Sequence, residues 1–161
     1  MTNLLLAREE WTAGISDGHN LEAIFIDFKK AFDMVPHTRL LHKLCMIGID
    51  GFTVRWIQDF LNGRTFVVQN QNVLSMWREM PSGVPQGSVL GPLLFVICIN
   101  DLSRELNSPC LMYADDLKIW RVIMDENDKV ILQDDLDRLT QWSITWQLPI
   151  NTSKCVRMKI A

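Results

Sequence analysis

Residues 110–122 read CLMYADDLKIWRV, two apolar segments joined by a short polar tip. Apolar, aromatic and β-branched residues on both sides of a turn predict a β-hairpin, with strands at 110–113 and 117–122. The tip consists of Ala114-Asp115-Asp116, so two adjacent carboxylates stand at the end of the hairpin. Taken alone, such a pair is typical of a solvated turn, and its meaning depends on the residues around it.

A third carboxylate lies far upstream, near the end of another predicted strand. Within residues 23–28, Ile24 and Ile26 alternate with Phe25 and Asp27, and this period of two predicts a strand with Asp27 at its carboxyl end. If that end lies beside the hairpin tip, three hard oxygen donors come together. Such donors select Mg²⁺, and a pair of ions can activate an attacking oxygen and hold a leaving phosphate.

The rest of the sequence alternates between helical and extended patterns. We expect Thr2 to cap the first helix, Asp33 to cap the turn before the helix that begins at His37, and Asn127 or Asp128 to cap the last helix. The expected helices cover 2–16, 37–47, 52–61, 88–106 and 127–146, and the further strands cover 64–69, 73–78 and 156–160. This order predicts an α+β fold, an antiparallel sheet with helices packed on one face and the other face free for a substrate.

The composition is that of a globular protein. The 161 residues are 48% hydrophobic and 22% charged, which suits one domain with a substantial core. The longest apolar run, residues 93–99, is far shorter than the ~20 residues of a membrane-spanning helix, and residues 1–6 lack the basic start of a signal peptide. The four cysteines are too scattered for a metal site. We therefore expect an intracellular protein without a membrane partner, in the nucleus or the cytoplasm.

Three further stretches accompany the Tyr113-Ala114-Asp115-Asp116 box in a fixed order. They read IDFKKAFD at 26–33, GVPQGSVLGPLLF at 83–95 and WQLPINTSK at 146–154. Together the four motifs resemble the palm of reverse transcriptases, and the closest likeness is to those of non-LTR (LINE-type) retrotransposons. The likeness covers nearly the whole chain, and four ordered motifs rarely coincide by chance.

The resemblance implies the metal site and the catalytic residues. Asp27 matches the metal ligand of the first motif, Asp115 matches the second ligand, and Asp116 is expected close to the metals, where it assists the primer end. The implied cofactor is a pair of Mg²⁺ ions, with Mn²⁺ as a possible substitute. Lys154 matches the lysine of the fourth motif, which neutralises or protonates the leaving pyrophosphate.

The resemblance also implies a nucleotide pocket. Phe32 matches the aromatic residue that blocks a ribose 2′-hydroxyl, so deoxynucleotides are favoured. Pro85-Gln86-Gly87 matches the loop that lines the pocket, where glycine permits close backbone approach and Gln86 can hydrogen-bond near the template base or the sugar. Phe28 lies beside Asp27 in the first motif, and Tyr113 is expected to support the primer terminus by packing.

The implied reaction is RNA-directed DNA synthesis, in which a primer 3′-hydroxyl attacks the α-phosphate of a deoxynucleoside triphosphate. The implied partners are an RNA template and a DNA primer. Two other polymerase classes fit less well: Phe32 argues against an RNA-dependent RNA polymerase, and Gly87-Ser88-Val89-Leu90-Gly91 is unlike an intron maturase. A non-catalytic transposon remnant or truncated gene product shares the motifs and stays an alternative. The sequence carries no signal for an oligomeric state.

The chain is expected to be a partial domain. A complete family member has fingers before this region and a thumb after it, so residues 1–161 correspond to the palm, and 1–20 are a remnant of the fingers connection. The net charge of −3 is unfavourable for contacts to phosphate, and in the family the basic surfaces lie in these flanking parts. Because such positive charge stabilises the transition state, we expect the isolated fragment to polymerise poorly or not at all.

Overall fold

The computed structural model describes residues 3–160, which form two compact units. The first unit contains residues 3–29 and 100–160, and the second contains residues 30–99. The second unit is therefore inserted into the chain of the first. The predicted capping residue Thr2 lies outside the described residues.

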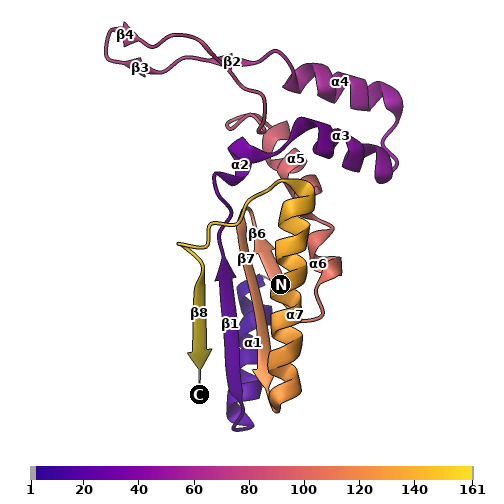
Figure 1. Cartoon of the computed structure of the whole chain (residues 1–161), viewed down its shortest axis with the longest axis vertical. Helices are drawn as coiled ribbons and strands as arrows, with labels where there is room; N and C mark the ends of the chain where they lie inside the picture. Colours follow the sequence, from indigo (N-terminus) through magenta and orange to yellow (C-terminus); the bar gives the residue numbers. More distant parts are fainter. Residues whose placement is uncertain (1–2, 161) are drawn as a thin grey trace. The chain divides into compact units, whose positions relative to one another are not determined.

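The first unit is built on an antiparallel sheet of four strands in the order β6-β7-β1-β8 (Figure 1). The strands are β1 (Asn20–Ile26), β6 (Cys110–Tyr113), β7 (Asp116–Ile123) and β8 (Val156–Ile160). Ile26 pairs with Leu117, and Tyr113 pairs with Asp116. This register brings the carboxyl end of β1 and the tip of the β6–β7 hairpin to the same end of the sheet.

Helices pack on both faces of this sheet (Figure 1). The long helix α7 (Glu126–Trp146) covers one face, where its Trp142 ring lies 6.1 Å from the ring of Phe28. On the other face, α1 (Asn3–Ser16) packs Ala7 and Trp11 against Ala23 and Trp120. The predicted α+β fold is confirmed, and α1 adds a helical layer beyond the single covered face that was expected.

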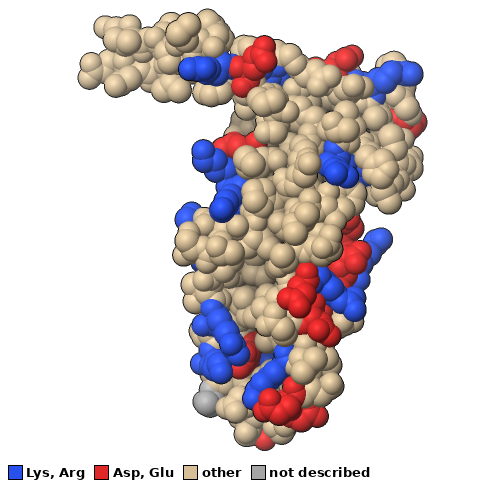
Figure 2. All heavy atoms as spheres, in the orientation of Figure 1, with Lys and Arg blue, Asp and Glu red and all other residues tan. Residues whose placement is uncertain are grey.

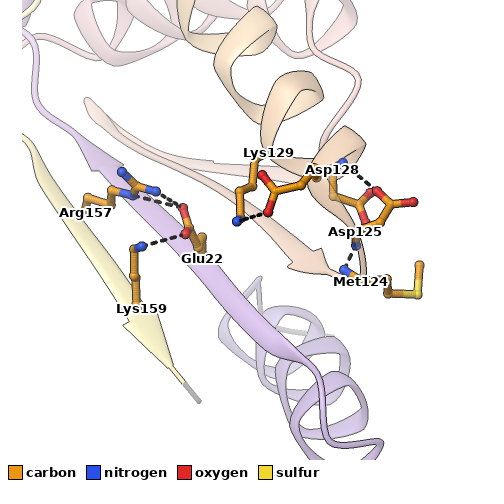
Figure 3. Close-up of polar contacts among 8 residues, drawn as sticks. Glu22, Met124, Asp125, Asp128, Lys129, Arg157 and Lys159 are labelled. Carbon is orange, nitrogen blue, oxygen red and sulfur yellow. Dashed lines mark hydrogen bonds and ion pairs between the residues drawn. The ribbon is translucent and has the colours of Figure 1, made fainter.

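The start of α7 is fixed by a capping box, shown in Figure 3. Asp125 accepts a hydrogen bond from the backbone of Asp128, whose carboxylate accepts from the backbone of Met124 and Asp125. The cap is therefore Asp125, and the predicted caps Asn127 and Asp128 are wrong, because Asp128 stands at the third helical position and completes the box. Asp128 also forms a 2.8 Å ion pair with Arg121 of β7, which ties the helix start to the sheet.

The second unit consists of helices and one long hairpin. The helices are α2 (Ala31–Met34), α3 (His37–Met46), α4 (Gly51–Leu61) and α5 (Leu90–Ile99), and the hairpin pairs β2 (Thr65–Phe66) with β5 (Arg78–Glu79) and β3 (Gln69–Asn70) with β4 (Val73–Leu74). The single helix predicted over 88–106 is wrong. It divides into α5 and, in the first unit, the short α6 (Leu102–Glu105), because Asn100 and Asp101 compete with helical hydrogen bonding.

The core of the second unit is formed by side chains from α3, α4 and α5. Leu40, Leu61 and Phe95 are fully buried, and the Lys43 ammonium is buried with them. Lys43 donates a hydrogen bond to the carbonyl oxygen of Cys98 in the last turn of α5, where the helix dipole favours a cation.

The hairpin arm of residues 65–77 contains no charged side chain, and its outer part is uncharged surface in Figure 2. Several of its large apolar residues are exposed, namely Phe66, Val68, Val73, Leu74, Met76 and Trp77. Within residues 3–160, no helix is long and apolar enough to cross a membrane.

Candidate active site

Asp27 lies directly after β1 and is held by the fourth-motif loop. Its backbone carbonyl oxygen accepts a hydrogen bond from the backbone N–H of Asn151 at 2.8 Å, and its Oδ2 accepts from the Asn151 side-chain amide at 2.9 Å. The preceding loop residue Ile150 bridges to Phe28, and Lys29 donates to Pro149. These contacts fix the end of the strand, while 28% of the Asp27 side chain stays accessible.

Asp115 and Asp116 lie at the tip of the β6–β7 hairpin. The turn consists of Ala114 and Asp115 between the paired residues Tyr113 and Asp116. Ala114 has a φ of +53°, the left-handed conformation that tight hairpin loops require at a central position. Asp116 is exposed, Asp115 is half-buried, and the Tyr113 side chain is 79% exposed. The tip therefore presents both carboxylates and an aromatic ring at the surface.

The donor set fits a divalent cation in its chemistry, and its three residues lie at the same end of the sheet. Carboxylates are hard oxygen donors, and the strand register gathers Asp27, Asp115 and Asp116 at one end of the sheet. Within residues 3–160, no group of three or more His, Cys, Asp or Glu side chains is close enough to enclose an ion in this structure. Because like charges repel, a cation between the three carboxylates would favour their closer approach.

Lys154 lies beside Asp27. Its Nζ is 4.0 Å from Oδ2 of Asp27, and 68% of its side chain is exposed. So loose a pair at the surface adds little to stability, and the exposed ammonium is free to turn toward a bound phosphate.

In the second unit, the predicted pocket loop is bound to the segment that carries Phe32. Val84 donates its backbone N–H to the carbonyl oxygen of Phe32 at 2.7 Å, and Gly83 donates to that of Val35 at 2.8 Å. Gly83 has a φ of +93°, and an added Cβ would lie 2.8 Å from Cα of Asp33. Only glycine therefore permits this close approach of the two backbones.

Gln86 and Asp33 form a pair that the sequence analysis missed. Nε2 of Gln86 donates to Oδ1 of Asp33 at 3.0 Å. The prediction that Asp33 caps the turn before α3 is wrong, because Asp33 lies inside α2 and the residue before α3 is Pro36, which makes no side-chain cap. The carboxylate instead orients the Gln86 amide. The one signal in the sequence was that both residues lie within motifs.

The remaining pocket residues are held by packing and by one serine. The Phe32 ring stacks on Phe95 with centroids 4.3 Å apart. Ser88 donates its hydroxyl to the carbonyl oxygen of the buried Pro85 and accepts from the backbone of Gly91, so the loop folds back onto the start of α5. Gly87 has a φ of +79°, which favours glycine at that turn.

Phe28 is predicted to bind substrate, but its side chain is only 3% exposed. Its ring packs against Trp142, which favours a role in supporting the strand end. The structure thus brings together Asp27, Phe28, Tyr113, Asp115, Asp116 and Lys154 in the first unit, and Phe32, Pro85, Gln86 and Gly87 in the second. Asn151 was also missed by the sequence analysis, and its only signal was its place three residues before Lys154.

Comparison with known proteins gives matches in sequence along most of the chain. The family model described as reverse transcriptase (RNA-dependent DNA polymerase) matches residues 12–160. The RNA-directed DNA polymerase from the mobile element jockey of Drosophila funebris is 32% identical over 145 residues, which cover 83% of this chain and 16% of that protein. The probable RNA-directed DNA polymerase from transposon BS of Drosophila melanogaster is 33% identical over 152 residues, 87% of this chain and 16% of that protein. The chain thus spans a small part of both relatives.

Solved structures match in fold. Telomerase from Candida tropicalis in complex with a fragment of telomeric RNA superposes with a TM-score of 0.67 and 16% identity. The match covers 98% of this chain and 29% of that one. At this identity the likeness shows the fold alone.

Proposed function

The chain belongs to the reverse transcriptase family, and we propose that it forms the catalytic palm of an RNA-directed DNA polymerase from a non-LTR retrotransposon. One observation carries the proposal: pairing of Ile26 with Leu117 puts Asp27 and the Asp115-Asp116 tip at one end of one sheet. The names of the curated relatives support the same activity. Because the chain spans 16% of the jockey polymerase, the activity and partners are proposed for a complete enzyme.

Asp27 and Asp115 are proposed as the ligands of two Mg²⁺ ions, which Mn²⁺ could replace, and Asp116 lies next to them. Reverse transcriptases generally use divalent metals, which supply charge neutralisation at the attacking and leaving oxygens when they are bound. The residues of this chain give the carboxylate oxygens and their fixed position at the sheet end. Tyr113, exposed beside them, packs against the end of the primer.

Phe32 and Gln86 are proposed to select the incoming deoxynucleotide, because hydrogen bonds of residues 82–84 to residues 32–35 and of Gln86 to Asp33 hold the two segments together. The Phe32 ring is fixed by Phe95 and has no hydrogen-bonding group to offer a 2′-hydroxyl. Pro85 and Gly87 shape the loop around Gln86, and Phe28, which was predicted to bind substrate, is proposed to support the strand end beside Asp27. The template would be RNA and the primer DNA.

Lys154 is proposed to hold positive charge where the pyrophosphate leaves. Its ammonium is already beside Asp27 and can donate a hydrogen bond or a proton to a phosphate oxygen. This role needs no buried position, since the phosphate itself brings the opposite charge.

The resemblance of the four motifs to a palm also supports a domain assignment. We assign residues 1–161 to the palm as a partial domain, with residues 1–20 as part of the connection to the fingers. An enzyme of this class acts inside the cell.

Primer extension on an RNA template, with Mg²⁺ and deoxynucleotides, tests the proposal. Three proteins are compared: this chain, an extended chain that continues at both ends as the relatives do, and the extended chain with Asp115→Asn. The extended chain should synthesise DNA, and Asp115→Asn should slow synthesis by about 100-fold or more, because several kcal/mol of charge stabilisation is lost. The isolated chain should be inactive or nearly so.

Asp125→Asn is the matched control, because it changes an acidic residue of the same unit and asparagine still caps a helix. It should leave synthesis close to normal. Full synthesis by Asp115→Asn would refute the site. Failure of the extended chain itself would favour the alternative, a non-catalytic remnant of a transposon.

A further inference from the structure

Asn151 makes more contacts to its surroundings than its place in a loop requires. Besides the two hydrogen bonds to Asp27, its side-chain oxygen accepts from the hydroxyl of Ser153 at 2.8 Å. Its backbone carbonyl oxygen accepts from the backbone N–H groups of Lys154 at 2.9 Å and Cys155 at 3.2 Å. The residue is therefore fixed at its backbone and at both ends of its side chain.

The contacts determine which way the Asn151 amide points. Oδ1 is engaged by the Ser153 hydroxyl, so the NH₂ group faces the carboxylate of Asp27. The reverse orientation would put an amide oxygen against a carboxylate oxygen, two acceptors without a proton between them. Asn151 can consequently act toward Asp27 only as a donor.

One oxygen of Asp27 is engaged and the other is available. Oδ2 accepts from Asn151 at 2.9 Å and lies 4.0 Å from Nζ of Lys154. Within the described residues 3–160, Oδ1 accepts no hydrogen bond. A carboxylate held by one oxygen keeps its plane and direction, and its second oxygen can bind a cation without a search through rotamers.

We propose that Asn151 is the positioning residue of the metal site: its amide holds Oδ2 of Asp27 and leaves Oδ1 available to a divalent cation. The inference rests on the proposed function, since it assumes that Asp27 binds metal. Asn151 is held in turn by the start of β8, because Val156 pairs with Phe25 of β1, two residues before Asp27. The fourth-motif loop thereby sets the direction of the first-motif ligand as well as carrying Lys154.

The test is a titration of this chain with Mn²⁺ alone, followed by the EPR signal of free Mn²⁺. Asn151→Ala keeps the backbone hydrogen bonds and removes the amide, and it should weaken Mn²⁺ binding about 10-fold, as the loss of other groups that orient metal ligands does. Ser153→Ala should give a smaller loss in the same direction, because the amide keeps its donor and loses its fixed orientation.

Two controls separate positioning from general loss of structure. Thr152→Ala changes an exposed neighbour and should bind Mn²⁺ like the unchanged chain. Asp128→Ala should lower the melting temperature of the same unit and leave Mn²⁺ affinity unchanged, because Asp128 stands at the start of α7. If Asn151→Ala lowers the melting temperature without weakening Mn²⁺ binding, Asn151 has only a structural role and the inference is wrong.

The same titration distinguishes failure of the proposed metal site from failure of the role of Asn151. If the unchanged chain does not bind Mn²⁺, or if Asp27→Ala binds it equally well, the metal site itself is wrong and the inference fails with it. If Asp27→Ala loses binding and Asn151→Ala keeps it, the metal site stands and the inference alone is overturned.

Discussion

At the residue scale, the pocket loop depends on a glycine whose hydrogen atom faces another backbone. Gly83→Ala would bring a methyl group to 2.8 Å from the backbone of Asp33 and would force a side chain into a φ of +93°. We expect the second unit to lose about 2–4 kcal/mol, since overpacking and left-handed strain add. Thermal unfolding of the two proteins measures this loss.

Gly63→Ala is the control for that substitution. Gly63 also has a positive φ, +65°, and an added Cβ would meet nothing within 4 Å. Gly63→Ala should therefore lower the free energy of unfolding only by the backbone strain, about 1 kcal/mol. Equal losses at both positions would show that the close approach of residues 83 and 33 does not constrain the loop.

Phe32 offers a second prediction at this scale. In the extended chain, Phe32→Val should raise the use of ribonucleotides relative to deoxynucleotides by about 10- to 200-fold, the range that a changed apolar contact supports. The ratio of kcat/KM for the two nucleotides measures it. Phe28→Leu is the comparison, because the Phe28 ring is buried against Trp142, and it should change stability without changing the ratio. If Phe32→Val leaves the ratio of kcat/KM unchanged, Phe32 does not line the nucleotide pocket.

Single residues differed in how far the sequence could predict them. The positions of Asp27 and Asp115 follow from local patterns, a strand that alternates and a hairpin with a polar tip. The hydrogen bonds from Asn151 to Asp27 and from Gln86 to Asp33 span 124 and 53 residues. Contacts of that separation depend on how elements pack, and no local pattern encodes them.

At the scale of elements, β8 is fastened to β1 by charges as well as by backbone pairing. Figure 3 shows the buried carboxylate of Glu22 between Arg157 and Lys159. Burial by itself raises the pKa of Glu22, but the hydrogen bonds and charges of Arg157 and Lys159 outweigh it and hold the pKa below 4.5, the ordinary value. The ionised form is therefore the one that the fold stabilises.

Because the pKa of Glu22 is lowered in the folded state, the stability of the fold should fall in acid. A carboxyl with a lowered pKa in the folded state stabilises fully above its unfolded pKa of 4.5, and the contribution is lost as pH falls through the folded pKa. Glu22→Gln should be less stable near neutral pH by about 1–3 kcal/mol and should lose less stability in acid. Urea unfolding at about pH 7 and about pH 3.5 measures both. If the free energy of unfolding changes with pH by the same amount in both proteins, the lowered pKa of Glu22 is wrong.

Elements were predicted well where one periodic pattern ran undisturbed and less well at their ends. β8 has the predicted range, 156–160, while the helix predicted over 88–106 is broken after Ile99. The start of α7 was misplaced because four acidic or amide residues stand in a row at 125–128, and only the geometry of the capping box decides which one caps the helix.

At the scale of the whole molecule, the sheet of the first unit is assembled from both ends of the sequence. Strand β1 precedes the insertion of residues 30–99, whereas β6, β7 and β8 follow it. The sequence predicted the strands and the α+β class. The strand order was not predictable from local patterns, because it depends on packing between segments that the whole second unit separates.

The acidic balance of the molecule also has a physical consequence at this scale. With a net charge of −3, the chain gains little from general attraction to phosphate, so the proposed binding of nucleic acid would rely on the cation proposed at the sheet end. The function proposed for this chain therefore depends on the metal site proposed at Asp27, Asp115 and Asp116.

Cleavage of the backbone by bound iron tests that claim most directly. Fe²⁺ replaces the divalent cation in this chain, ascorbate and peroxide generate hydroxyl radicals at the ion, and mass spectrometry locates the cuts. We predict cuts beside residue 27 and beside residues 115–116, both suppressed by excess Mg²⁺ and both lost in Asp115→Asn. Cuts confined to other segments, or cuts at only one of the two segments, would contradict a cation shared by the three carboxylates.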